Sequence, residues 1–380
     1  METLEIFEEF SLYLKEMKSQ GKKIIAFISH DNIPEELIDA AGFIPLRLIF
    51  AGNDELMDAS HDYLPPSTCA FAQTCIGLFA LKPRHFNFLD LVDYFIVSNH
   101  CVSDICASEV ICKYFNIPRL NFYISYMRNP NSEKYFRLEV SNFRKNLEEI
   151  RNGPISDDMI IESIKKYNEF RKVIKDINNL DIKGSIKLKL MQKAFLFGPN
   201  ILPELRDFIA SNENSISNNS KSIDLLLTGC SIFMNDTLID LIEEGGGNIV
   251  FFDTWIGYNY YSQQFKESTY NHVKNPIDLL ASRYINNAYS DHSVPNFLEN
   301  RITHIEEIYR NYEAKTGKRL GIINHIIKFC DHMSLMSSFF KNNLQEKGIK
   351  VLNVERDYSR ANRGQLSTRI EAYLEMIQSE

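Results

Sequence analysis

The feature that most constrains the fold is an alternation of short apolar runs with longer, helically periodic segments, which occurs in two regions of the 380-residue chain. Each apolar run has the length of a buried strand, and each longer segment repeats its apolar residues every three or four positions. Strands and helices that alternate at this spacing are typical of parallel sheets with helices on both faces. The sequence therefore predicts an α/β fold with two parallel-sheet domains of Rossmann-like or flavodoxin-like type.

A helical region and a polar connection separate the two alternating regions. The first region has expected strands at residues 23–28, 44–50, 94–98 and 119–124. The second has expected strands at residues 223–228, 249–253, 320–327 and 350–354. Residues 211–222 (SNENSISNNSKS) have the composition of an exposed connection. We therefore predict an N-terminal α/β domain over residues 1–210, with a helical extension over about 132–210, and a C-terminal α/β domain over residues 223–380.

Composition argues against several classes of protein. The chain has 42 basic and 50 acidic residues, a formal net charge of −8, whereas a nucleic-acid-binding protein usually gathers a basic excess on one face. No window approaches the roughly 20 apolar residues that a membrane span requires. The first residues are acidic, unlike a secretory signal. We therefore expect a cytoplasmic protein with no nucleic-acid partner and no membrane span.

Several familiar chemical motifs are absent from the sequence. There is no Gly-x-x-x-x-Gly-Lys-Ser/Thr loop, so any ATP hydrolysis would belong to a partner. Three glycines at residues 245–247 follow a predicted helix, which indicates a turn rather than a dinucleotide site. Neither Cys-x-x-Cys nor His-Glu-x-x-His occurs. A metal site would therefore have to be assembled from distant segments.

Seven cysteines, an odd number in a long chain, favour reduced thiols or metal ligands over a disulfide framework. Cys69 falls in the first turn of a predicted helix, where free N–H groups and the helix dipole favour a thiolate. Cys101 and Cys330 each follow a predicted strand, at the edge where α/β sheets bind ligands. Cys230 also follows a strand and is a rival candidate.

The positions of the other three cysteines give weaker support for a role as metal ligands. Cys106 and Cys112 lie inside one predicted helix and face different directions, so we expect both to pack in the core. Cys75 lies six residues beyond Cys69 and should also point elsewhere, unless a shift at the helix end brings it near. The residues alone leave two interpretations open: three converging thiolates, or seven ordinary buried cysteines.

Six segments in a fixed order decide between these interpretations by resemblance. They are residues 33–47 (IPEELIDAAGFIPLR), 69–77 (CAFAQTCIG), 94–101 (YFIVSNHC), 226–229 (LLTG), 327–331 (IKFCD) and 364–372 (GQLSTRIEA). Together they resemble the 2-hydroxyacyl-CoA dehydratase and benzoyl-CoA reductase family, nearly from end to end of the chain. The likeness is to the iron–sulfur subunit of the 2-hydroxyglutaryl-CoA dehydratase D-component type.

The resemblance implies that Cys69, Cys101 and Cys330 hold one [4Fe-4S] cluster between the two domains. The fourth iron would be left for water, sulfide, another protein sulfur or substrate, and the contribution of Cys75 or Cys230 stays open. Two positions depart from the family. Val102 follows Cys101 where many relatives carry Asp, and Trp255 stands where some relatives carry another cysteine, which argues against a larger cluster.

The resemblance also implies a function. The chain would be a subunit of a lyase, an ATP-activated 2-hydroxyacyl-CoA dehydratase that removes water through a radical to give an enoyl-CoA. Its partners would be a homologous dehydratase subunit, an ATP-dependent iron–sulfur activator protein and the acyl-CoA substrate. The chain could bind substrate or relay electrons, and its compact length and its Pro34-Glu35-Glu36 segment favour the relay. The alternatives are a component of an ATP-dependent benzoyl-CoA-type or other small-molecule reductase, and a metal-free binding or scaffold protein.

Five further polar residues have two interpretations each. Glu35 and Glu36 could orient a substrate, but the compensation of a helix dipole is the favoured interpretation. His30 and His100 lie beside strand ends and could move protons, although structural histidines are commoner there. Arg47 could meet acidic groups of coenzyme A, although exposed or ion-paired arginines are commoner.

Overall fold

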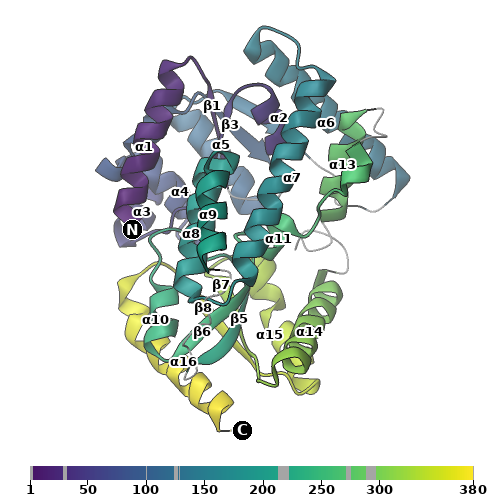
Figure 1. The fold of residues 1–380 in the computed structure, drawn as a ribbon. Helices are drawn as coiled ribbons and strands as arrows, with labels where there is room; N and C mark the ends of the chain where they lie inside the picture. The colour runs from purple at the N-terminus through teal and green to yellow at the C-terminus, as the bar shows by residue number, and fades with distance from the viewer. Residues whose placement is uncertain are drawn as a thin grey trace.

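Two four-stranded parallel sheets organise the part of the chain that the computed structural model describes, which is residues 3–28, 32–99, 101–123, 127, 129–212, 222–270, 275–287 and 297–379. The first sheet lies in the upper half of Figure 1 and the second in the lower half. Helices cover both sheets. The predicted α/β class with two parallel sheets is therefore confirmed. No helix within these ranges is long and apolar enough to cross a membrane.

The first sheet has the strand order β2-β1-β3-β4. Its strands are β1 (Ile24–Ile28), β2 (Ile44–Leu48), β3 (Tyr94–Ser98) and β4 (Arg119–Phe122). Strand β1 is buried throughout, as expected for a parallel strand covered on both faces. The chain leaves β1 to one side for β2 and returns on the other side with β3. This reversal opens a crevice at the carboxyl ends of β1 and β3, where α/β folds bind ligands.

The second sheet repeats this plan with the order β6-β5-β7-β8. Its strands are β5 (Ile223–Gly229), β6 (Gly247–Asp253), β7 (Gly321–Ile327) and β8 (Val351–Arg356). All seven residues of β7 are buried. The order reverses between β5 and β7, so the crevice of this sheet lies at the carboxyl ends of those two strands.

The helices fall into three groups along the chain. Those of the first sheet are α1 (Thr3–Ser19), α2 (Glu35–Ala40), α3 (Asp54–Ser60), α4 (Ala70–Leu81), η1 (Arg84–Leu91) and α5 (Val102–Tyr114). Those of the predicted helical region are α6 (Pro130–Arg151), α7 (Asp157–Asn179), α8 (Gly184–Phe197), η2 (Gly198–Ile201) and α9 (Leu202–Asn212). Those of the second sheet are α10 (Leu238–Glu244), α11 (Tyr258–Tyr261), α12 (Glu267–Tyr270), α13 (Pro276–Asn287), α14 (Phe297–Thr316), α15 (Asp331–Glu346), η4 (Arg360–Asn362) and α16 (Arg363–Gln378).

The helical region contacts both sheets. In α7, Arg171 forms an ion pair with Glu36 of α2, while Asn178 donates a hydrogen bond of 3.0 Å to the carbonyl oxygen of Phe252 in β6. The predicted connection at residues 211–222 lies mostly outside the described residues, so the division of the chain at that point stays a prediction.

Contacts between the loops that follow the strands join the two sheets. Phe50 forms a parallel bridge with Met234, and the ring of Phe71 stacks on that of Phe233 at 4.0 Å. The N–H of Ala70, at the start of α4, donates to the carbonyl oxygen of Lys328, just after β7. The loops at the carboxyl ends of one sheet therefore contact those of the other. A site in either crevice would be lined by residues from both sheets.

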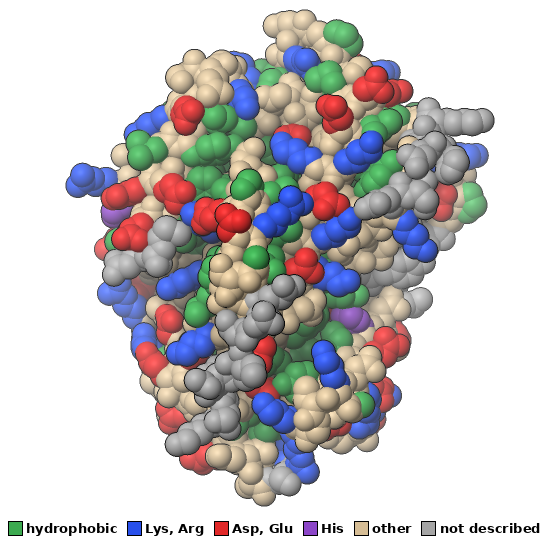
Figure 2. Space-filling view, in the orientation of Figure 1, with side chains coloured by type: hydrophobic (Ala, Val, Ile, Leu, Met, Phe, Trp, Pro, Cys, Tyr) green, Lys and Arg blue, Asp and Glu red, His purple; other side chains and the backbone are tan. Residues whose placement is uncertain are grey.

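The surface carries charges of both signs. On the face drawn in Figure 2, Lys and Arg side chains lie among Asp and Glu side chains across the described residues, with apolar patches between them. This distribution accords with the composition, in which acidic residues slightly outnumber basic ones.

Candidate functional site

Three of the predicted site residues occupy the same local position, immediately before a helix. Cys69 precedes α4, Cys101 precedes α5 and Cys330 precedes α15. A residue at this position lies beside backbone N–H groups that have no partner within the helix. The N–H of Asp104 donates to the sulfur of Cys101 at 3.3 Å. The first turns of the three helices thus point positive partial charge at the three thiols.

The thiols from both sheets meet. Cys69 and Cys330, 261 positions apart in the sequence, are hydrogen-bonded through their thiols, and the Cys330 thiol also contacts that of Cys230. Cys101 is close enough for the charges of Cys69 and Cys330 to raise its pKa. The structure therefore gathers the three predicted residues and adds Cys230. Their role as ligands stays a prediction.

The surroundings of the three predicted cysteines, Cys69, Cys101 and Cys330, favour the thiol form over the thiolate. The hydrogen bond to Cys330, together with burial, raises the pKa of Cys69 well above its ordinary value. Burial also raises the pKa of Cys101 well above its ordinary value. The backbone amides of Phe71 and Ala72 lower the pKa of Cys69, but by less. The helix start therefore favours a thiolate at Cys69, as expected, but the hydrogen bond to Cys330 and burial outweigh this effect in the metal-free chain.

The three other cysteines have different surroundings. Cys75 is fully buried inside α4. Cys112 is half-buried against the core, as expected. Cys106 is exposed on α5, so the expectation that it packs in the core is wrong. Cys106 and Cys112 are six positions apart, which on a helix turns one toward solvent when the other faces the core.

The donor chemistry fits an iron–sulfur cluster, although no single-ion site is formed. Within the described residues, no three His, Cys, Asp or Glu side chains are placed so as to hold one metal ion. Buried thiols supplied by distant segments are the ligand type of iron–sulfur clusters, which spread their thiolates around a core larger than one ion. Ligation would also remove the protons that burial now retains on these thiols.

A hollow of about 310 Å³ has no cysteine among the described residues that line it, but one of these, Tyr358, lies near enough to Cys69 and Cys230 to be affected by their charges. The buried hydroxyl of Tyr358 has no hydrogen-bond partner within the described part of the chain. The Tyr358 ring packs so closely on Gly52 that a Cβ added to Gly52 would lie 2.8 Å from it. The remaining lining residues that carry charge are Asp236, Arg356, Asp357, Arg360 and Arg363. The lining therefore has three arginines against two aspartates; Asp236 pairs with Arg356, whereas Asp357 pairs with Lys328 and Arg363 with Glu244, both outside the lining.

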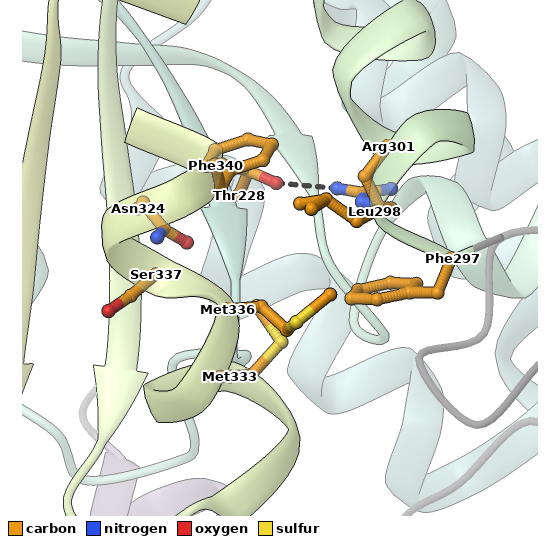
Figure 3. Close-up of a pocket in the computed structure, with 9 residues that line it drawn as sticks. All are labelled: Thr228, Phe297, Leu298, Arg301, Asn324, Met333, Met336, Ser337 and Phe340. Atoms are coloured by element: carbon orange, nitrogen blue, oxygen red, sulfur yellow. Dashed lines mark hydrogen bonds between the residues drawn. The ribbon is translucent and has the colours of Figure 1, made fainter. Parts of the chain in front are cut away.

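A second, much smaller pocket lies between α14 and α15 (Figure 3). Arg301 of α14 donates to the Thr228 hydroxyl oxygen at 2.5 Å and pairs with Asp253. Although burial opposes it, the Arg301 guanidinium holds the pKa of Asp253 at about 2. Met333 and Met336 of α15 close the pocket, which has room for about one water molecule. Sequence reasoning missed Arg301, because an arginine in a helix of mixed charge gives no signal of burial.

The two glutamates that open α2 are internal ion-pair partners. Glu35 accepts a bidentate pair of hydrogen bonds from Arg47, at 2.9 and 2.8 Å, so the ion-pair interpretation of Arg47 is confirmed. Glu36 accepts from Arg171 at 2.6 Å, and both side chains are fully buried. His30 and His100, the other two candidates for proton transfer, lie outside the described residues.

Comparison with known proteins now gives the family. Residues 32–377 match the family model described as 2-hydroxyglutaryl-CoA dehydratase, D-component. The chain belongs to this family. The resemblance seen in the six sequence segments is confirmed, and with it the expectation of a subunit of the dehydratase type.

Relatives with assigned activities include subunits of two dehydratases and of one reductase. The chain is 26% identical to the (R)-phenyllactyl-CoA dehydratase beta subunit of Clostridium sporogenes, over 96% of this chain and 94% of that protein. It is 22% identical to the beta subunit of (R)-2-hydroxyglutaryl-CoA dehydratase from Acidaminococcus fermentans, over 98% of both. It is also 27% identical to one of the subunits of benzoyl-CoA reductase from Thauera aromatica, over 42% of this chain and 40% of that protein.

Proposed function

We propose that this chain is the [4Fe-4S] subunit of an ATP-activated 2-hydroxyacyl-CoA dehydratase and that Cys69, Cys101 and Cys330 hold the cluster. The observation that carries the proposal is the meeting of these thiols at three helix starts, two from the first sheet and one from the second. Relatives that match nearly the whole chain are beta subunits of dehydratases for 2-hydroxyacyl thioesters.

The chemistry explains why such an enzyme needs a low-potential centre. The β proton of a 2-hydroxyacyl thioester is too weakly acidic to be lost directly. When bound, the cluster would supply the electron that activates the thioester carbonyl for loss of hydroxide, and recover it afterwards. The chain's own residues would bury the thiolates, direct backbone N–H groups at their sulfurs and exclude bulk water.

Two partners complete the proposal. The sequence contains no phosphate-binding loop, so the energy that drives a low-potential electron would come from a separate ATP-dependent iron–sulfur activator. Two relatives that match nearly the whole chain are named as beta subunits, which supports a homologous second subunit for this chain.

The test is anaerobic reconstitution with iron and sulfide, followed by analysis of both elements and by EPR of the reduced protein. We expect about four irons per chain. Replacement of Cys69, Cys101 or Cys330 by Ser should abolish or strongly destabilise the cluster. Cys106→Ser, on the exposed side of α5, is the matched control and should keep it. A chain that takes up no iron, or that binds zinc tightly instead, would refute the proposal and favour a metal-free scaffold.

The alternative is a component of an ATP-dependent reductase, which the partial match to benzoyl-CoA reductase supports. The two candidates differ in electron balance. A dehydratase recycles its electron, whereas a reductase consumes electrons in proportion to product. Counting electrons consumed per thioester converted therefore separates them.

A further inference from the structure

Cys230 and Cys330 flank the reversal point of the second sheet. The sheet order reverses between β5 and β7, and these two strands run side by side with Gly229 paired to His325. Cys230 directly follows β5, and Cys330, which precedes α15, lies three residues after the end of β7. When the chain leaves two neighbouring strands in opposite directions, the residues that follow the strands lie around one crevice. The two thiols are hydrogen-bonded to each other there.

The backbone holds Cys230 in this position. Gly229 has a φ of 91°, and a Cβ added to it would lie 2.3 Å from the His325 carbonyl oxygen, so only glycine permits this close approach. The N–H of Cys230 then donates to that oxygen at 2.8 Å, and Nδ1 of His325 donates to the Cys230 carbonyl oxygen at 2.8 Å. Reciprocal hydrogen bonds therefore fix the direction of the Cys230 side chain.

The surroundings of the Cys230 sulfur suit a metal thiolate. Its side chain is buried, and the N–H of Ile327 points at the sulfur from 3.5 Å. Backbone N–H donors to sulfur stabilise the thiolate form and tune the potential of iron–sulfur centres. A cysteine that only fills space needs no such donor.

We propose that Cys230 is a fourth protein ligand of the cluster, completing the set formed by Cys69, Cys101 and Cys330. This inference rests on the proposed function and deepens it. Four thiolates leave no iron open to substrate. The chain would then relay electrons to its partner subunit, and any direct contact between substrate and a cluster iron would belong to that partner.

Two neighbouring groups are weaker candidates for the fourth position. The His325 imidazole donates through Nδ1 to the Cys230 carbonyl oxygen and leaves Nε2 without a partner among the described residues, but the side chains whose charges act on the ring are Arg356 and Asp236 rather than the cysteines. Cys75 lies within α4, where burial raises its pKa, and among the described residues no backbone N–H other than its own supports its sulfur. Cys75 therefore serves as a matched control for the loss of a buried thiol.

The test compares the wild-type chain with Cys230→Ser, Cys230→Ala and Cys75→Ser after anaerobic reconstitution. Each cluster is treated with mild ferricyanide, which removes an iron that lacks a cysteine ligand, and EPR detects the three-iron product. We expect the wild type and Cys75→Ser to keep four irons and both Cys230 variants to lose one. Added cyanide should alter the EPR spectrum of the Cys230 variants only. Circular dichroism verifies that each variant is folded.

The other possible results distinguish a failure of the Cys230 assignment from a failure of the proposed function. If the wild type loses one iron as readily as the Cys230 variants, Cys230 is not a ligand, although the cluster and the dehydratase proposal stand. More than four irons per wild-type chain would also overturn a cubane closed by four thiolates. If no chain takes up iron, the proposed function itself fails.

Discussion

At the scale of single residues, the site combines soft donors with an environment that keeps them protonated. Hydrogen bonds between thiols, together with burial, raise the pKa values of Cys69 and Cys330, and burial raises the pKa of Cys101. A bound metal would reverse this balance, because it replaces the protons and compensates the thiolate charge. Metal uptake should therefore release protons and become tighter as the pH rises.

The thiol pKa values predict an order of chemical reactivity. In the reduced, metal-free chain at pH 8, iodoacetamide should modify the exposed Cys106 first and the buried Cys69 and Cys75 last, because only an accessible thiolate reacts. A time course followed by peptide mass spectrometry measures the order. In urea the differences should vanish. Labelling of Cys69 at the rate of Cys106 in the folded chain would contradict the buried, protonated site.

Protonation of His325 predicts the acid side of the stability profile. Burial, assisted by Arg356, lowers the pKa of this histidine to about 3, against about 6.5 in the unfolded chain. The unfolded state therefore binds more protons between these values, and the contribution of neutral His325 to stability is lost as the pH falls below about 6.5. The free energy of unfolding should drop by about 1.5 kcal/mol between pH 6.5 and 5.

Urea unfolding at several pH values measures this slope. The loss of Asp253 ion pairing lies below pH 3.8 and does not interfere. His325→Gln should flatten the profile between pH 5 and 6.5, and the exposed His85→Gln is the matched control. An unchanged slope in His325→Gln would show that another group titrates there.

At the scale of elements, α2 is tied to the helical region by a buried charge cluster. Although burial alone would raise it, the guanidiniums of Arg171 and Arg283 hold the pKa of Glu36 below its ordinary value. Tyr284 of α13 also donates to Glu36, at 2.8 Å. A short helix of six residues is thus fixed to α7 and α13 by one carboxylate.

Removal of the Glu36 charge should be costly. Glu36→Gln leaves two buried guanidiniums uncompensated, and we expect the free energy of unfolding to fall by about 3–5 kcal/mol. The control is Glu109→Gln, which breaks an exposed pair with Arg119 and should cost less than about 1 kcal/mol. Urea titrations at pH 7 compare the two. Equal losses in both variants would mean that the buried cluster is not the source of the stability.

The elements also show what the sequence can predict. The apolar runs at residues 223–228 and 320–327 predict β5 and β7 within one residue of their observed bounds, because strands buried on both faces are continuous apolar runs. Side-chain contacts between residues that are far apart in the sequence have no comparable local signal. The sequence places Glu36 at a helix start, but its partner lies 135 positions away. The contact of Cys230 with Cys330 likewise depends on β5 and β7 being neighbours, which strand spacing alone does not determine.

At the scale of the whole molecule, the site exists only because the two sheets meet. Cys69 and Cys101 belong to the first sheet, whereas Cys230 and Cys330 belong to the second. The sequence could locate each cysteine at the end of an element and, by resemblance, name three as ligands. It could not show that the connecting loops touch, as they do where Ala70 bonds to Lys328.

The arrangement of the whole molecule predicts that the isolated chain has no dehydratase activity. It lacks a phosphate-binding loop, and a cluster closed by four thiolates would have no iron for substrate. Conversion of a 2-hydroxyacyl-CoA to its enoyl-CoA should therefore need the homologous subunit, the activator, Mg-ATP and a strong reductant together. Under strict anoxia, omission of any one should abolish turnover. Turnover that persists without both ATP and reductant would refute the radical mechanism, because no other source could then supply the activating electron.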